Sequence, residues 1–232
     1  MDLESFKKQF TKSELEITEE YDRIFSFIDF SNVNKWFEDD NQDWNNKLLS
    51  GDEKLSIDLE KLKSFADIFS QRTRVYYGED PRNMKSLAFT DVIRIIFGKR
   101  DVITKDLQKI KHYLELDETE FKKYICIDRN DKKYVEIRKC NFDVEISVDA
   151  IKMLEHYDTF CIFSGDADFV YLNNFLKRKG KKIIIIKAGY ITTKLRESAD
   201  LVINAQNIKK SIVKIIKQKP DWVRFLWIVF PN

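Results

Sequence analysis

The sequence predicts an α/β fold in which helices cover both faces of a mainly parallel sheet. Short apolar runs, the expected strands, alternate with helical segments along the chain. Most of these runs are apolar on both sides, as in strands buried within a parallel sheet, and right-handed crossovers then place helices on both faces. The expected strands are residues 24–28, 74–78, 159–163, 183–186 and 201–203. With 232 residues, 43% of them hydrophobic, we expect one domain with insertions.

The N-terminal elements follow from periodicity and turn signals. Residues 1–21 are expected to form a helical extension before the first strand, because Phe6 and Phe10 lie in a charged, amphipathic stretch. A polar loop is predicted over residues 38–52. Apolar residues at helical spacing then predict a helix from Leu55 to Phe69. Residues 84–116 fit a helix and a strand equally well.

A β-hairpin is predicted where residues 124–127 and 134–137 flank Arg129-Asn130-Asp131. It belongs to an insertion of about residues 84–138 within a domain spanning residues 22–206. Later helices are expected from Asn141 to His156, up to Lys179, around Leu195, and from Asn207 to Lys219. Residues 207–232 would form this last, basic helix and an apolar tail.

The charge distribution favours a polyanionic partner near the C-terminal third. Residues 1–70 carry 9 basic and 17 acidic side chains, whereas residues 171–224 carry 14 and 3, although the net charge is only +2. Three scattered cysteines predict a reducing, cytoplasmic location. No apolar run reaches the roughly 20 residues of a membrane span. The tail over residues 222–230 leaves open packing on the core, a homodimer, or an interfacial anchor.

Aspartates follow two of the expected strands at the point where each ends. Asp29 closes the first strand, Asp166 and Asp168 follow the strand over residues 159–163, and Asp143 begins the helix before that strand. Ligands bind beyond the carboxyl ends of parallel strands. Clustered carboxylates repel one another unless a cation neutralises them, and Mg²⁺ and Mn²⁺ prefer oxygen ligands. The pattern indicates a divalent metal site.

A structural reading competes with this one, because each aspartate taken alone is more often a helix cap or a loop residue. Jointly that reading requires several coincidences. Asp29, Asp143 and Asp166 would all have to fall by chance at positions that the sheet brings to one edge.

These residues also carry a resemblance to a known family. Over residues 22–206 the sequence resembles the NYN domains of the PIN-like nuclease superfamily, in their bacterial LabA-like form. The segments that match are Ile28-Asp29-Phe30-Ser31-Asn32, Asp143-Val144-Glu145, Ser164-Gly165-Asp166-Ala167-Asp168-Phe169, Gly180-Lys181-Lys182 and Thr193-Lys194-Leu195. The Ser-Gly-Asp-x-Asp-Phe element after an apolar strand is the most specific of them.

The resemblance implies a PIN-like three-layer α/β/α sandwich and an endoribonuclease that depends on Mg²⁺ or Mn²⁺, with single-stranded or structured RNA as partner. By position it assigns Asp29, Asp143 and Asp166 to the metal, Asn32 to an amide beside it, and Asp168 to a fourth acid. A rival interpretation is a catalytically weak RNA-binding regulatory module of the same fold. A phosphatase is disfavoured because Ser31 stands where an aspartyl-phosphate enzyme has a second aspartate.

Further positions come with the resemblance or with the basic segments. Ser164, Asp149 and Asp200 match family positions, although helical geometry puts Asp149 about 240° around the helix from Asp143. Asp200 precedes its strand, which predicts the other edge of the sheet. Expected contacts to nucleic acid, if these cations are more than a solvated face, are Lys139, Lys177, Arg178, Lys181, Lys182 and Lys194. Tyr76 and Tyr77 fit base stacking or the core.

Overall fold

The structure is a computed structural model that describes residues 3–114 and 125–217, apart from the side chains of Leu3 and Arg138. Predictions for the apolar tail, including a homodimer formed through it, lie outside the described residues. Within the described part, no helix is both long enough and apolar enough to cross a membrane.

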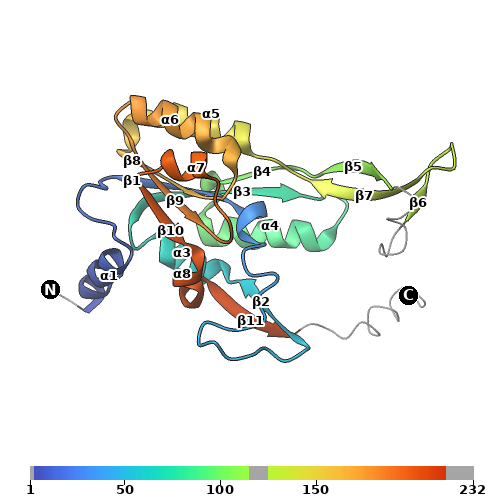
Figure 1. Ribbon diagram of the computed structural model, residues 1–232, viewed down its shortest axis with the longest axis horizontal. Coiled ribbons are helices and arrows are strands. Elements are labelled where there is room, and N and C mark those ends of the chain that lie inside the picture. Colours follow the sequence, from blue (N-terminus) through green and yellow to red (C-terminus); the bar gives the residue numbers. More distant parts are fainter. Residues whose placement is uncertain (1–2, 115–124, 218–232) are drawn as a thin grey trace.

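A six-stranded, entirely parallel sheet forms the centre of the molecule, in the order β10-β9-β8-β1-β3-β4 (Figure 1). Its two central strands, β1 and β8, are buried along their whole length, which explains their continuous apolar sequences. The strands are β1 (Ile24–Asp29), β3 (Ser70–Glu79), β4 (Val102–Asp106), β8 (Thr159–Phe163), β9 (Lys182–Lys187) and β10 (Leu201–Asn204). All five predicted strands are present.

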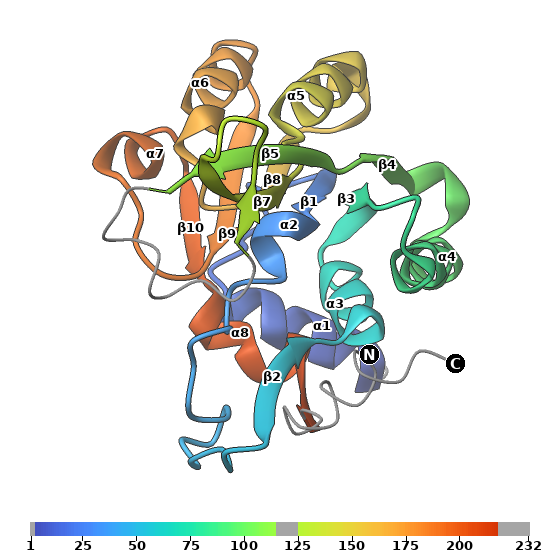
Figure 2. The same ribbon diagram turned by 90° about the vertical axis from the view of Figure 1, so that its right-hand side faces the viewer.

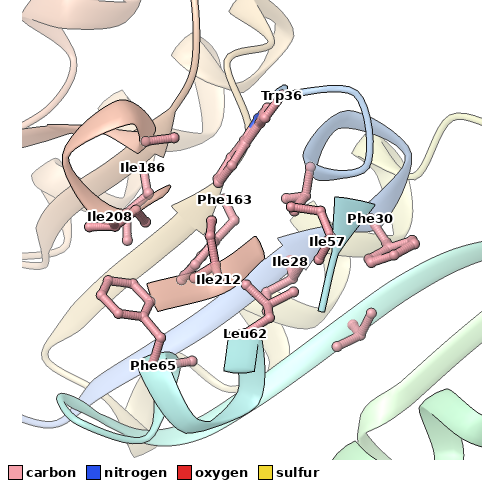
Figure 3. Packing of buried hydrophobic residues seen from close by; sticks show 14 of the residues in the cluster. Ile28, Phe30, Trp36, Ile57, Leu62, Phe65, Phe163, Ile186, Ile208 and Ile212 are labelled. Carbon is pink, nitrogen blue, oxygen red and sulfur yellow. The ribbon is translucent and has the colours of Figure 1, made fainter. Parts of the chain in front are cut away.

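Helices cover both faces of this sheet, as the three-layer sandwich predicts (Figures 1 and 2). One face carries α5 (Asp143–Lys152), α6 (Val170–Arg178) and α7 (Thr193–Glu197). The other carries α2 (Phe30–Val33), α3 (Leu59–Ala66), α4 (Met84–Phe97) and α8 (Ala205–Ile212). Alternate residues of each strand serve the two cores, so that Ile184 and Ile186 join one and Ile183 and Ile185 the other. Figure 3 shows part of the second face's core, where Leu62, Phe65 and Ile212 pack with Ile28 and Phe163.

The predicted hairpin is part of a small antiparallel sheet that projects from the body, which we call the arm (Figure 1). It contains β5 (Gln108–Tyr113), β6 (Cys126–Ile127) and β7 (Lys133–Lys139), in the order β5-β7-β6. Its turn holds Asp131 at a φ of 55°, a left-handed conformation that aspartate tolerates better than most residues. The ambiguous region therefore resolves into α4, a 3₁₀ turn η1 (Lys99–Asp101), β4 and β5.

Two predicted helices are wrong in part, and for the same reason. Residues 53–57 form β2 (Glu53–Ile57) and residues 213–217 form β11 (Val213–Lys217), which pair antiparallel. Each segment is short and rich in β-branched or alternating residues, so a strand partner outweighs a weak helical period. The helix that remains, α3, begins after Asp58, whose carboxylate accepts from the N–H groups of Glu60 and Lys61.

Other helix ends shift by smaller amounts. The N-terminal helix α1 (Leu3–Glu14) ends before the predicted limit at residue 21. Likewise α5 ends at Lys152, and a separate 3₁₀ turn, η3 (Leu154–His156), completes the predicted helical stretch. These differences leave the sheet and its carboxyl edge as predicted.

Candidate metal centre

Asp29 ends β1 and is fixed as the N-terminal cap of α2. Its Oδ1 accepts from the Ser31 N–H at 3.1 Å, the Ser31 hydroxyl at 2.6 Å and the Asn32 N–H at 3.4 Å. The residue is only 7% exposed. Burial raises the pKa of its carboxyl, the hydrogen bonds oppose that effect, and the negative charge of Asp166 raises it further. Asp29 is thus an acid held in place by three hydrogen bonds and repelled by the negative charge of Asp166.

Asn32 ties the loop after β1 to the loop after β8. Its side-chain Oδ1 accepts from the Trp36 indole N–H at 2.9 Å and from the Gly165 N–H at 3.4 Å. Both partners can only donate, so they fix which side of the amide is oxygen. The Trp36 ring lies parallel to Phe163 at 6.2 Å between centroids. Asn32 therefore positions the two acid-bearing loops and keeps its NH₂ group as a donor.

Asp166 and Asp168 are oriented by a tight turn at the end of β8. The Asp166 N–H donates to the hydroxyl of the buried Ser164 at 3.2 Å. Asp166 caps the 3₁₀ turn η4 (Ala167–Phe169), accepting from the Asp168 N–H at 3.0 Å. Phe169 anchors this turn in the core. The two carboxylates are in this way carried by one locally determined structure.

Asp143 is the first residue of α5. The Asn141 side chain accepts from its N–H at 2.7 Å, so Asn141 caps the helix start even though Phe142 occupies the cap position. Phe142 is buried against Tyr76 and holds the helix start to the sheet. Burial raises the pKa of the Asp143 carboxyl, as do the negative charges of Asp166, Asp168 and Asp29.

The acids converge at the carboxyl edge of the sheet. One carboxylate oxygen each from Asp143, Asp166 and Asp168 lies within 4.8 Å of the others. Asp29 lies outside this triple but lines the same cavity, whose volume is about 870 Å³. Among the lysine, arginine and histidine side chains that the structure describes, none forms an ion pair with any of these four acids. The resemblance assigned Asp29, Asp143 and Asp166 to the metal and Asp168 to a fourth acid. In the structure Asp168 belongs to the close triple and Asp29 lines the same cavity.

The rest of the cavity wall comes from segments far apart in the sequence. Lys139, Cys140 and Asn141 at the base of the arm line it, as do Lys35 and Gly189. Sequence patterns alone passed over Lys35, Cys140 and Gly189.

Gly78 is required in this wall. A Cβ there would lie 2.7 Å from the Cys140 Cβ and 2.7 Å from the Leu107 Cδ2, so any side chain would displace the base of the arm. Among the wall residues that the sequence analysis did not name, Trp36 could have been found from the sequence. It stands four residues after Asn32, the spacing at which side chains meet on a helix.

Two predicted acids lie away from the cluster. Asp149 accepts from Arg74 Nη1 at 2.5 Å and from the Tyr76 hydroxyl at 2.9 Å, in agreement with its predicted rotation around the helix. Tyr76 is fully buried, and burial followed by the Asp149 charge raises the pKa of its phenol. Asp200 lies at the amino edge, where it accepts from the Ile183 N–H at 2.8 Å and pairs with Lys177 at 3.3 Å.

The basic run over residues 177–182 is also at the amino edge, where β9 begins. A strand of six residues spans about 20 Å, so this run lies a strand length from the acids. Lys181 donates to the Tyr157 carbonyl at 2.6 Å and Lys182 pairs with Glu20 at 2.8 Å, while Arg178 is exposed. Of the six cations predicted to contact nucleic acid, Lys139 lines the cavity and Lys194 lies exposed on α7.

Comparison with known proteins agrees with this architecture. The chain is 31% identical over 94 residues to the "Low amplitude and bright protein LabA" of Synechococcus elongatus (strain ATCC 33912 / PCC 7942 / FACHB-805), covering 40% of this chain and 50% of that protein. The chain thus spans about half the length of this curated relative. Its fold resembles the crystal structure of a protein of unknown function, VPA0982, from Vibrio parahaemolyticus RIMD 2210633. That likeness has a TM-score of 0.54 at 17% identity and covers 85% of this chain and 99% of that one.

The family is shown by a match that covers most of the chain. The profile of the NYN domain matches residues 23–208, which contain all the acids discussed above. These boundaries are close to the domain that the sequence predicts. The chain belongs to the NYN domain family.

Proposed function

We propose that this protein is a ribonuclease that hydrolyses internal phosphodiester bonds of RNA with the help of bound Mg²⁺ or Mn²⁺. The observation that carries the proposal is the triple of carboxylates within 4.8 Å of one another, without a basic partner among the described residues. The family adds weight, because NYN domains generally include ribonucleases.

The side chains present fit a hard divalent cation. Three negative charges this close are mutually unfavourable unless a cation neutralises them. Oxygen ligands from a few carboxylates, completed by waters and substrate phosphate, are the set that Mg²⁺ favours. We propose Asp143, Asp166 and Asp168 as the residues that hold the cation, with the buried Asp29 beside them as a further ligand or as the group that orients a ligand.

A cation in this place would polarise the scissile phosphate and lower the pKa of an attacking water. The protein contributes position and charge around it. The Asn32 NH₂ group is a donor held at the junction of the two acid-bearing loops and can orient a phosphate oxygen. Lys139 and Lys35 line the cavity as cations, which suits a polyanionic substrate.

The direct test compares wild type, Asp166→Asn and Asp91→Asn. Asp91 is a matched control because its side chain is 74% exposed on α4 and lies outside the cavity. Each protein is incubated with labelled RNA, DNA of the same sequence and a phosphomonoester, with Mn²⁺ and with EDTA. We expect wild type and Asp91→Asn to cleave RNA with Mn²⁺ but not with EDTA. We expect Asp166→Asn to be inactive in both.

Other outcomes separate the alternatives. RNA cleavage that survives both EDTA and Asp166→Asn would exclude the proposed mechanism. RNA binding without cleavage in any metal would favour the regulatory RNA-binding module.

We propose the cytoplasm as the location, since the three cysteines are free thiols.

A further inference from the structure

The arm presents two chemically different faces. In an antiparallel sheet, residues directly opposite each other point to the same side, and successive residues alternate. The register pairs Ile110 with Ile137 and His112 with Val135, which gathers the apolar strand residues on one face, beside the polar Gln108, Lys133 and Lys139. We call the opposite side the basic-aromatic face; its described residues are Lys109, Lys111, Tyr113, Cys126, Tyr134 and Glu136.

The basic-aromatic face combines cations with accessible aromatic rings. Tyr113 and Tyr134 are directly opposite, with centroids 5.8 Å apart, and Tyr113 is 48% exposed. The ammonium group of Lys111 lies 4.5 Å from the Tyr134 centroid, and Lys109 pairs with Glu136 at 3.1 Å. Rings that other side chains hold in place while remaining open to solvent are suitable platforms for stacking bases.

The arm is connected directly to the acids. Leu107, which directly precedes β5, and Lys139, the last residue of β7, line the cavity with Asp143. From the end of β7 the chain runs through Cys140 and Asn141 straight into α5. Lys139 is five positions after Tyr134 in β7, so the tyrosine pair lies about 17 Å along the strand from the cavity wall. Figures 1 and 2 show the arm leaving the body at the carboxyl edge of the central sheet.

The charge of the arm suits a polyanion. Residues 108–114 and 125–139 contain seven basic and three acidic side chains. Cations that neutralise phosphates supply most of the affinity for a nucleic acid, and aromatic rings bind only those bases whose faces are free. Bases within a duplex are already stacked on their neighbours. This chemistry therefore favours an unpaired strand over a duplex.

We propose that the basic-aromatic face of the arm binds unpaired RNA and delivers it to the acids, so that the substrate is a single-stranded segment long enough to reach from the cavity to the tyrosine pair. This proposal rests on the ribonuclease function proposed above. It assigns the inserted segment the role of a substrate-binding arm, with Tyr113 and Tyr134 as stacking residues and Lys109 and Lys111 as phosphate contacts.

The test measures affinity as a function of RNA length. All proteins carry Asp166→Asn to prevent cleavage, and binding of labelled single strands of about 20 and about four nucleotides is followed by fluorescence anisotropy with Mg²⁺. The variants are Tyr113→Ala and the double variant Lys109→Gln with Lys111→Gln. The control is Lys132→Gln with Lys133→Gln, which removes the same charge from the turn and the opposite face.

We expect Tyr113→Ala to weaken binding of the long strand about tenfold and to leave the short strand unchanged. The Lys109 and Lys111 double variant should make the negative slope of log affinity against log salt shallower by about 1.4. The control should alter neither the affinity nor this slope. Circular dichroism and melting of each variant establish that it is folded.

Several results would overturn the proposal. Equal losses for long and short strands, equal losses in the control, or equal affinity for duplex and single-stranded RNA would each do so. Arm variants that change the oligomeric state without changing RNA affinity would assign this face to a second copy of the chain. If the protein that retains Asp166 cleaves RNA but the arm variants bind RNA as tightly as the Asp166→Asn parent, only the arm proposal fails. If the protein neither binds nor cleaves RNA, the ribonuclease proposal fails as well.

Discussion

Two aspartates on the same helix should respond in opposite ways to the same substitution. Asp143 and Asp149 both belong to α5, but Asp143 faces other carboxylates whereas Asp149 is bound by Arg74 and Tyr76. We predict that Asp143→Asn stabilises the metal-free protein and abolishes activity. We predict that Asp149→Asn destabilises the protein and leaves the folded fraction active.

The magnitudes follow from the geometry. Two unit charges at the 4.8 Å limit of the triple repel by about 0.9 kcal/mol at the dielectric constant of water and about 3.5 kcal/mol at an effective value of 20. Because Asp143 is partly exposed, we expect Asp143→Asn to raise the free energy of unfolding by about 1 kcal/mol. Asp149 and Arg74 have side chains 20% and 18% exposed. Removing that pair should cost about 2 kcal/mol, less than a fully buried pair because of solvent screening.

The assay is thermal melting in EDTA, followed by melting with Mn²⁺ and by RNA cleavage. For a protein of this size, 1 kcal/mol shifts Tm by roughly 2–4 °C. Asp143→Asn should therefore melt a few degrees above wild type and Asp149→Asn roughly 4–8 °C below it. Mn²⁺ should raise the Tm of wild type and of Asp149→Asn, and that of Asp143→Asn much less. A lower Tm for Asp143→Asn, or loss of cleavage by folded Asp149→Asn, would refute the reasoning.

Three further predictions follow from the same site. Gly78→Val should displace the base of the arm, because its Cβ would lie 2.7 Å from two neighbours. We expect the unfolding free energy to fall by about 2 kcal/mol and RNA cleavage to be lost. The control Gly51→Val, which has open space around it, should change neither. Asn32→Ala should lower the free energy of unfolding by about 2 kcal/mol, because the buried Trp36 indole N–H loses its acceptor, and urea unfolding compared with an Asn32→Ala, Trp36→Phe double variant measures that part. The raised pKa values of Asp29 and Asp143 mean that these two carboxyls bind more protons in the folded protein than in the unfolded chain just above the ordinary aspartate range. The unfolding free energy of wild type in EDTA, measured relative to that of Asp143→Asn, should therefore fall as pH rises through that window, while the stabilisation by added Mn²⁺ grows. A difference that rises with pH would contradict this assignment.

The central strands and the acids that follow them were predictable from the sequence because the information is local. Apolar runs such as residues 159–163 and 183–186 can be buried on both faces only inside a parallel sheet. Asp29 and Asp166 follow their strands directly, so the shared carboxyl edge brings them together. The hairpin around Asp131 was predictable for the same reason, since its turn residues and flanking strands are adjacent in sequence.

Features that depend on a distant partner were decided by the tertiary structure alone. Residues 53–57 and 213–217 become strands only because they pair with each other, and no local pattern distinguishes that from a weak helix. The turn after β8 brings Asp168 within 4.8 Å of Asp143 and Asp166, whereas Asp29 lies on the wall of the same cavity. The sequence thus determined which residue types end each strand, whereas the three-dimensional fold determined which of them share a cavity, because that depends on strand direction, turn geometry and long-range pairing.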